Sequence, residues 1–373
     1  MKILMLNYEF PPIGGGASPV TFELCVQLVR MGHRVDVVTM HYDKLPRFEI
    51  REGIYIYRTP AIRKRADVCQ THEMASYLPG ALIKAVRLAK REKFDVIHCH
   101  FMVPGGPVAW MSSKLTGLPF LITCHGSDVP GHNPERFTVV HKLIKPVWRF
   151  LARRTPLIIS PSESLKKLIL HNCPGVKVEI IPNGIHVSQF KPSKKTKSIL
   201  MCSRFFNFKG FQYAIGAIKD MSLDWQVNLV GEGPYLGELK KIAEGSKTPV
   251  KFWGWIDKSD PKFYELFAKS SIFVFPSEAE NFPSVLLEAM AAGTAIITSN
   301  AGGCPEVVGE AGLLVPPRDT DAIRSALNKL IGSEQLRNQL SQAAVKRVKM
   351  FDWENVAGKY VDCYHRLIEG AAK

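Results

Sequence analysis

The chain has 373 residues, of which 46% are hydrophobic and 22% charged, and it contains 28 glycines and 25 prolines. This length is enough for two globular domains, and the composition excludes collagen-like and disordered chains. The 49 basic and 34 acidic residues give a net charge of +15, and most of the excess lies before residue 187. A positive field favours phosphorylated ligands, acidic lipid or nucleic acid without choosing among them.

The first half alternates short apolar runs with longer segments of helical period. Strands are expected at Lys2–Asn7, Val35–Met40, Ile54–Thr59, Asp95–His100, Pro119–His125, Leu157–Ser160 and Val178–Ile181. Helices are expected near Ser18–Met31, Leu78–Arg91, Gly106–Leu115, Arg136–Arg153 and Ser162–His171. Continuously apolar strands suit a sheet that is buried on both faces, and the alternation predicts parallel strands with right-handed crossovers.

The first expected strand runs into a loop with three consecutive glycines, Gly14, Gly15 and Gly16. Ligands of open parallel sheets bind beyond the carboxyl ends of the strands, next to helix N-termini, and a glycine backbone can approach an anion closely. The loop lacks the spacing of a dinucleotide-binding or Walker motif, so a plain turn is an equally good interpretation.

Two segments that bear histidines lie at the ends of apolar strands. His125 and Asp128 stand at the end of the expected strand Pro119–His125. There His125 could donate a hydrogen bond to a sugar hydroxyl and Asp128 could accept one. The alternative is a histidine that only satisfies the loop backbone. His98 and His100 look like a metal-binding pair. We expect alternate strand residues to point to opposite faces, and we therefore predict no metal there.

The second half repeats the alternation. Strands are expected at Ser198–Ser203, Gln226–Val230, Val250–Trp253, Ile272–Pro276, Ala295–Thr298 and Leu313–Val315. Helices are expected near Gly210–Asp220, Pro234–Ala243, Pro261–Ala268, Ser284–Ala292 and Asp319–Leu330. Two Rossmann-like α/β domains follow, 1–186 and 187–352, and the amphipathic segment 353–373 is expected to pack back on the first. The polar stretch 181–195 could instead be a surface loop within one domain, although a single sheet of a dozen strands would be unusual.

Four charged residues of the second half stand where strands end or helices begin. Arg204 and Lys209 bracket the loop after the first strand, where two cations suit a diphosphate that gains negative charge as it leaves. Glu280 follows a later strand, and Glu288 lies among apolar residues of the next helix, where a ribose diol would offer it two donors. On position alone, solvated cations and helix charges that complement the dipole remain open alternatives.

Taken together, the motifs resemble the retaining glycosyltransferases of family four. The segments that carry the resemblance are PPIGGG, HGSD, IIPNGIHVSQF, SRFFNFKG, LVGEGP, FPSEAENFPSVLLEAMAAGTAIITSNAGGCPEVV and GLLVPPRD. The resemblance covers nearly the whole chain, and its most specific part is the pair of glutamates with an arginine and a lysine upstream. It implies the GT-B fold, in which two Rossmann-like domains face each other across a cleft.

The resemblance also implies roles for single residues of the second domain. Arg204 and Lys209 match the basic residues that bind the donor diphosphate. Glu288 matches the residue that accepts hydrogen bonds from the ribose hydroxyls. Glu280, with the loop Asn281-Phe282, matches the part that holds the donor sugar. Arg204, Lys209 and Glu280 are therefore predicted to be catalytic as well as donor-binding.

In the first domain, the resemblance implies that the backbone N–H groups of Gly15 and Gly16 contact the donor phosphates. It also implies that His125 lies near the transferred sugar, where we predict it to be catalytic. Asp128 is our candidate contact for the acceptor. The chain departs from many relatives at Pro283, which replaces a glycine and has no N–H for a ligand contact.

The implied reaction moves a sugar from a nucleoside diphosphate sugar to a hydroxyl with retention at the anomeric carbon. The departing diphosphate is expected to help remove the acceptor's proton, so that catalysis rests on electrostatic stabilisation and positioning. We expect neither a metal nor another cofactor, because the two cations can take the place of a metal and no D-x-D motif is present.

The expected acceptor is a lipid-linked glycan or a precursor of a surface polysaccharide. Basic residues gather in the segments 63–67 and 142–154, and the second is also apolar, which suits an anionic membrane surface. A helix that buries its apolar face in its own domain is the alternative. Because the eight cysteines form no C-x-x-C pair and no signal peptide is evident, we predict a cytoplasmic protein. The basic segments add the prediction that it is peripheral on the inner face of the membrane.

Two other enzymatic functions remain as rivals. A soluble transferase could act on a small sugar or a sugar phosphate, and a nucleotide-sugar epimerase of the same fold would need no acceptor. A nucleic-acid partner is not expected, because no recognisable binding module accompanies the positive charge.

Overall fold

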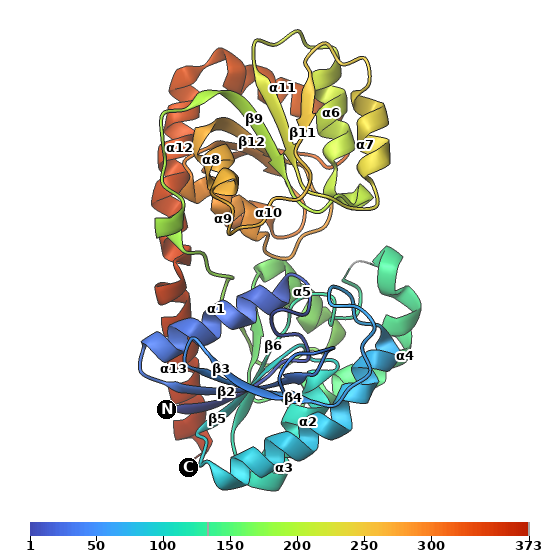
Figure 1. Ribbon diagram of the computed structural model, residues 1–373, viewed down its shortest axis with the longest axis vertical. Helices are drawn as coiled ribbons and strands as arrows, with labels where there is room; N and C mark the ends of the chain where they lie inside the picture. The colour runs from blue at the N-terminus through green and yellow to red at the C-terminus, as the bar shows by residue number, and fades with distance from the viewer. Residues whose placement is uncertain (133, 372–373) are drawn as a thin grey trace. The chain divides into compact units, whose positions relative to one another are not determined.

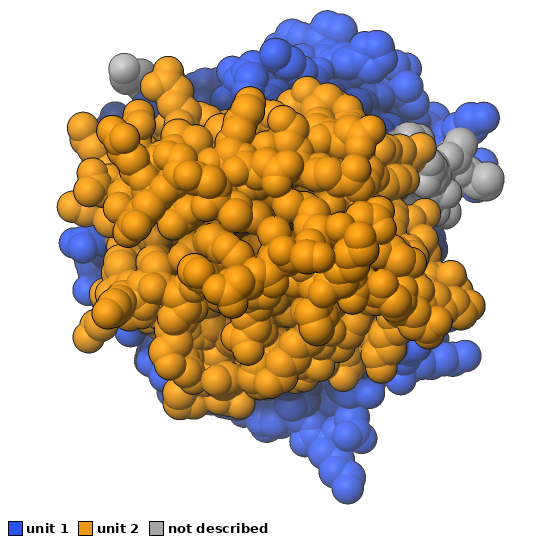
Figure 2. All heavy atoms as spheres, turned by 90° about the horizontal axis from the view of Figure 1, so that it is seen from above, with its two compact units in different colours: residues 1–183, 353–373 blue, residues 184–352 orange. Residues whose placement is uncertain are grey.

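The computed structural model describes residues 1–132 and 134–371, which form two compact units (Figures 1 and 2). Unit 1 comprises Met1–Asn183 and Trp353–Lys373, and unit 2 comprises Gly184–Asp352. The chain leaves unit 1 within the polar stretch where the sequence predicts a join. It returns at Trp353, where the last amphipathic segment begins.

Unit 1 is built on an eight-stranded sheet in which every neighbouring pair is parallel except β3 and β4. The sheet order is β3-β4-β2-β1-β5-β6-β7-β8. The strands are β1 (Lys2–Leu6), β2 (Arg34–Met40), β3 (Phe48–Arg51), β4 (Ile54–Thr59), β5 (Val96–His100), β6 (Phe120–Thr123), β7 (Ile158–Ser160) and β8 (Val178–Ile180). Strand β3 was not predicted from the sequence, because this edge strand is short and mostly exposed and so lacks an apolar run. Its hairpin turn uses Glu52 and Gly53 at φ of 52° and 76°.

Helices cover both faces of this sheet (Figure 1). They are α1 (Ala17–Arg30), α2 (Thr71–Arg91), α3 (Gly105–Thr116), α4 (Pro134–Ala152), α5 (Glu163–Asn172) and α13 (Trp353–Ala371). Leu4 and Leu6 of β1 share a core with α2 and α3, whereas Ile3 and Met5 share the opposite core with α1 and α13. Alternate residues of one strand therefore serve two cores, as expected for a sheet buried on both faces.

Helix α2 begins at Thr71, seven residues before the predicted start. A capping box explains the early start, because the Glu73 side chain accepts from the backbone N–H of Gln70 at 2.8 Å. Pro79 lies inside the helix, one residue after the predicted start.

Unit 2 is built on a six-stranded sheet that is parallel throughout, in the order β11-β10-β9-β12-β13-β14. The strands are β9 (Thr196–Cys202), β10 (Gln226–Val230), β11 (Val250–Phe252), β12 (Ser270–Phe275), β13 (Ala295–Ser299) and β14 (Gly312–Val315). The helices are α6 (Phe211–Lys219), α7 (Leu236–Ala243), α8 (Pro261–Lys269), α9 (Ser284–Ala291), α10 (Cys304–Val308), α11 (Thr320–Gly332) and α12 (Glu334–Val348). The two parallel sheets confirm the predicted α/β class.

Two helices of unit 2, α10 and α12, were not predicted. Helix α10 is a single short turn, and α12 is so polar that only Leu340, Ala344 and Val348 of its 15 residues are buried. Its start has a physical signal, since the Ser333 hydroxyl accepts from the Leu336 N–H at 3.1 Å. Among the helices of the described residues, none is both long and apolar enough to cross a bilayer.

Candidate active site

The loop after β9 carries a lysine that is paired with a carboxylate. Lys209 ends the short turn η2 (Asn207–Lys209), and its Nζ donates a hydrogen bond to Glu280 Oε1 at 2.5 Å. The Ser277 hydroxyl donates to the same oxygen at 2.7 Å. The charged side chains are only 15% and 13% exposed, so each charge compensates the other's loss of water. The structure thus brings together two residues that were predicted to bind the donor.

Arg204 lies on the same loop, two residues after β9 ends. Its side chain is exposed, and its guanidinium carbon lies 5.3 Å from the centroid of the Phe206 ring. No carboxylate in the part of the chain that the structure describes forms an ion pair with Arg204. This guanidinium therefore has its charge and its hydrogen-bond donors available for an anionic ligand.

Glu288 is buried on α9, with 4% of the residue exposed, and its carboxylate accepts a hydrogen bond from Lys258 Nζ. Lys258 belongs to the loop between β11 and α8. Burial lowers the pKa of Lys258, but the Glu288 carboxylate outweighs burial, so that the pKa lies above its ordinary value. A ribose that binds Glu288 has to share the carboxylate with this ammonium or displace it.

Two glycines hold the Glu280 loop in place. The Gly303 N–H donates to the Glu280 carbonyl oxygen at 2.8 Å. A Cβ atom on Gly303 would lie 1.7 Å from the Asn281 carbonyl oxygen, and one on Gly302 would lie 2.3 Å from that of Glu280. Only glycine permits so close an approach of two backbones. The segment before α10 therefore positions the loop that carries Glu280 and Asn281.

Phe282 and Pro283 lead from this loop into α9. The Phe282 side chain is buried in the core of unit 2, where its ring packs edge-on against Phe351 with centroids 5.4 Å apart. A donor contact from Phe282 must therefore come from its backbone, because the ring is already packed. Pro283 is the N-cap residue of α9 and makes no side-chain cap.

The glycine loop of unit 1 already contains a carboxylate. Glu9 Oε2 accepts from the Gly15 N–H at 3.1 Å, and Glu9 Oε1 accepts from Arg63 Nη2 at 3.1 Å. A Cβ atom on Gly15 or Gly16 would meet nothing within 4 Å, so both positions border open space. Gly14, by contrast, is required sterically: it has a φ of 109°, and a Cβ atom there would lie 2.6 Å from that of Glu9.

A row of three histidines ends at His125. Its Nε2 atom lies 2.8 Å from His100 Nδ1, and the His100 ring stacks on that of His98 with centroids 4.4 Å apart. Our expectation that His98 and His100 point to opposite faces was wrong, because a strand has a period of two and places residues i and i+2 on the same face. Burial lowers the pKa of His98 and of His125 to about 3, so both rings are neutral at neutral pH. His125 can therefore offer hydrogen bonds to a ligand, but no positive charge.

Asp128 holds the loop around His125. Its Oδ1 accepts from the N–H groups of His125 and Gly126 at 2.9 and 3.1 Å, and its Oδ2 accepts from the Met102 N–H at 2.7 Å. Only 4% of the residue is exposed. Burial raises the pKa of Asp128, against the lowering effect of the Met102 and His125 amides. The structure thus shows a loop-organising role, while the contact with an acceptor stays a prediction.

No group of three histidine, cysteine, aspartate or glutamate side chains within the described residues is arranged to hold a metal ion. Whether the reaction needs a metal is a separate matter, and metal independence stays a prediction.

Comparison with known proteins adds sequence evidence for both units. A model described as Glycosyltransferase Family 4 matches residues 14–189, and one described as Glycosyl transferases group 1 matches residues 185–347. Together the two models span residues 14–347, and they identify the chain as a glycosyltransferase of the family 4 type. The resemblance that the sequence motifs indicated is therefore confirmed.

Relatives and solved structures agree with this assignment. An uncharacterised glycosyltransferase of Methanocaldococcus jannaschii is 28% identical, with 99% of each chain covered. The glycosyltransferase superposes on sucrose-phosphate synthase from Thermosynechococcus elongatus with a TM-score of 0.83, at 21% identity and 99% coverage of both chains. It also superposes on Anabaena HepE, solved in complex with UDP-glucose, with a TM-score of 0.76, at 20% identity and coverage of 98% and 100%. These likenesses confirm the GT-B fold.

Sequence reasoning missed two features of this glycosyltransferase's candidate site. Lys258 lies in a polar segment that resembles solvated surface, and the available signal was the buried Glu288, which needs a counter-ion. The pair Gly302-Gly303 was part of a quoted motif without a stated role. Two adjacent glycines in the loop that follows a strand are a signal for close backbone approach.

Proposed function

We propose that this glycosyltransferase moves a sugar from a nucleoside diphosphate sugar to a hydroxyl group, with retention of configuration at the anomeric carbon. The observation that carries the proposal is the loop after β9, where Lys209 pairs with Glu280 and Arg204 has no counter-ion among the described residues. Two cations on one loop before α6 suit a diphosphate, whose charge grows as its bond to the sugar breaks. The UDP-glucose bound to HepE supports this class of donor.

In the proposed complex, donor binding exchanges partners within the site. Diphosphate oxygens replace the Glu280 carboxylate as the partner of Lys209, and Glu280 turns to the hydroxyls of the donor sugar. Glu288 accepts from the ribose diol beside Lys258. Because Lys209, Glu280 and Glu288 already have polar partners in the structure, the charged side chains are held near their working positions before the donor arrives.

The transfer step needs no protein nucleophile. The acceptor oxygen attacks the anomeric carbon on the face from which the diphosphate leaves, the bond to the diphosphate breaks, and the acceptor's proton passes to a diphosphate oxygen. Arg204 and Lys209 stabilise the charge that develops on the leaving group. Neutral His125 supplies a hydrogen bond to the transferred sugar, and no metal is required.

We place the reaction on the cytoplasmic face of a membrane, with a lipid-linked glycan or a surface-polysaccharide precursor as acceptor. The excess positive charge before residue 187 and the eight free cysteines support this location. A small sugar or sugar phosphate is the alternative acceptor. An epimerase of the same fold would convert the donor with no acceptor present, which separates it from both transferases.

The first test is nucleotide binding, followed by turnover. Calorimetry with UDP, GDP and ADP identifies the nucleotide that the protein binds. The corresponding sugar nucleotides are then screened with acceptors for turnover. The anomeric coupling constant in the product's NMR spectrum reports whether the configuration is retained. Lys209→Ala is expected to lower kcat about 100-fold or more, because it removes a cation from the leaving group. Lys240→Ala, which changes an exposed lysine on α7, is the matched control. Wild-type turnover in Lys209→Ala, or an inverted product, contradicts the proposal.

A further inference from the structure

Helix α4 of unit 1 exposes a stripe of large apolar side chains. Leu143, Val147 and Phe150 are 75%, 52% and 40% exposed, and their spacing of four and three residues aligns them along one side of the helix. Trp148 and Leu151 of the same helix are almost fully buried in the core of unit 1. The packing of α4 against its own unit is therefore supplied by other residues, and this packing does not account for the exposed stripe.

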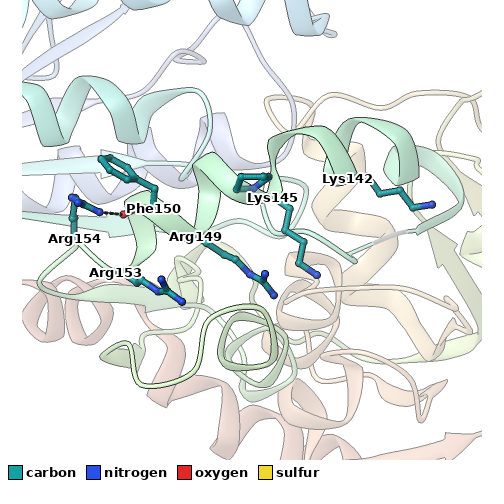
Figure 3. A pocket seen from close by; sticks show the side chains of 7 residues that line it. Lys142, Lys145, Arg149, Phe150, Arg153 and Arg154 are labelled. Atoms are coloured by element: carbon teal, nitrogen blue, oxygen red, sulfur yellow. Dashed lines mark hydrogen bonds between the residues drawn. The ribbon is translucent and has the colours of Figure 1, made fainter.

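Five cations accompany the stripe. They line a shallow hollow of about 460 Å³ (Figure 3) and are Lys142, Lys145, Arg149, Arg153 and Arg154. The segment 141–154 contains no aspartate or glutamate, and among the described residues no carboxylate forms an ion pair with any of the five. Within the described residues, the surface therefore carries five positive charges that no carboxylate pairs with.

Two of these cations also have structural contacts. Arg149 Nε donates to the Asn172 carbonyl oxygen at 2.8 Å, and the Arg154 guanidinium lies 3.6 Å from the centroid of the Phe150 ring. Lys142, Lys145 and Arg153 are the members whose side chains can be changed without loss of such a contact. We call the five cations and the stripe of Leu143, Val147 and Phe150 the α4 surface.

We propose that the α4 surface docks on an anionic phospholipid bilayer, with its cations on the phosphate groups and Leu143 and Val147 inserted between the headgroups. Cations and aliphatic side chains lie side by side on α4 and on the turn that follows it, and they match both layers of such an interface, the charged headgroups and the upper acyl chains. A nucleic acid fits less well, because the two most exposed apolar side chains, Leu143 and Val147, are aliphatic and offer no face on which a base could stack. The third, Phe150, already has the Arg154 guanidinium over its ring. The inference rests on the proposed function in one respect: docking on a bilayer would bring the enzyme to a lipid-linked acceptor.

The test measures binding of the full chain to sedimenting vesicles. Vesicles of phosphatidylcholine with phosphatidylglycerol should retain the protein at low salt and release it at high salt, and vesicles of phosphatidylcholine alone should not retain it. The triple variant Lys142→Gln, Lys145→Gln, Arg153→Gln should bind about 100-fold more weakly, at about fivefold per cation. The double variant Leu143→Ser, Val147→Ser should lose about tenfold with all charges in place.

The matched control removes the same charge from unit 2. Lys240→Gln, Lys329→Gln and Lys346→Gln change three exposed lysines and should leave vesicle binding as in the wild type. Equal losses in the two triple variants, or an unchanged affinity in the Leu143→Ser, Val147→Ser variant, would overturn the proposal. Tighter binding of a single-stranded oligonucleotide than of anionic vesicles would also overturn it.

The docking and the proposed function can fail separately. Calorimetry with the selected nucleotide is run on the same preparations, and all α4 variants should bind it as the wild type does, because none of the changed residues belongs to the candidate active site. Vesicle binding without nucleotide binding would reject the proposed function and leave the docking standing. Nucleotide binding without vesicle binding would reject the docking alone.

Discussion

The Nε2 atom of His125 lies 2.8 Å from the Nδ1 atom of His100, and the two rings are stacked with centroids 5.1 Å apart. One nitrogen donates and the other accepts, so the tautomer of one ring sets that of the other. His100 stacks on His98, whose Nδ1 atom lies 2.7 Å from the Tyr364 hydroxyl on α13. The row thus connects the last helix to the residue predicted to lie near the transferred sugar.

This buried row predicts loss of stability in mild acid. The folded pKa of His98 and of His125 is about 3, against an ordinary value of 6.5, so below pH 6.5 the unfolded chain binds protons that the folded chain does not. The free energy of unfolding should therefore be undiminished above pH 6.5 and fall between pH 6.5 and 3, by about 2 kcal/mol per histidine at pH 5. Urea denaturation at pH 7 and pH 5 measures the difference.

Two variants check the origin of this acid effect. His125→Asn should weaken the pH dependence, because it removes one of the groups whose pKa is lowered. His171→Gln, which changes an exposed histidine on α5, should retain the wild-type dependence. Equal urea midpoints at pH 7 and pH 5 in the wild type would show that the histidines do not control stability in this range.

Recognition of the ribose can be tested through Glu288. The wild type should prefer a nucleoside diphosphate to its 2′-deoxy analogue by about tenfold or more, because a carboxylate that accepts from the diol loses one donor in the analogue. Glu288→Gln should remove most of this preference. Lys258→Met retains the carboxylate and removes its internal partner, so the preference should persist. Titration calorimetry gives both affinities, and an undiminished preference in Glu288→Gln would exclude Glu288 as the ribose contact.

Arg204 should act on the rate rather than on the fold. Because its side chain is exposed and has no ion pair among the described residues, Arg204→Ala should leave the melting temperature unchanged. We expect kcat to fall about 10- to 100-fold with little change in KM, since the leaving group's charge is largest in the transition state. Arg204→Lys should restore part of the rate. Steady-state kinetics that show a raised KM with an unchanged kcat would instead assign Arg204 to ground-state binding.

The backbone contact at Gly303 should be necessary for the Glu280 loop. Gly303→Ala brings a Cβ atom to within 1.7 Å of the Asn281 carbonyl oxygen, so one backbone segment has to move. We expect a loss of about 1–3 kcal/mol in the free energy of unfolding and weaker nucleotide binding. Gly237→Ala, in open space on α7, should stabilise the protein by up to about 1 kcal/mol. Denaturation and calorimetry on both variants make the comparison, and Gly303→Ala behaving like Gly237→Ala would refute it.

The contribution of the sequence is clearest at Lys209 and Glu280. Apolar runs that stop at polar or charged residues are local signals, and they were enough to place both residues in loops that follow strands. Their contact joins positions 71 residues apart and requires β9 and β12 to be neighbours in the sheet. Strand order is set by the packing of the whole core, so the family resemblance could suggest the contact, but local pattern could not. The same limit hid the pairing of Lys258 with Glu288.

Helix α4 shows the same division on a smaller scale. Its sequence predicts an amphipathic, basic helix, because residue composition and the period of apolar residues are properties of the local chain. They do not reveal that Trp148 packs inward at 0% exposure while Leu143 faces outward at 75%, since the rotation of a helix about its axis is decided by the neighbours it packs against. Element types and strand-end positions could thus be read from the chain, whereas pairs and faces emerged only once distant segments were packed together.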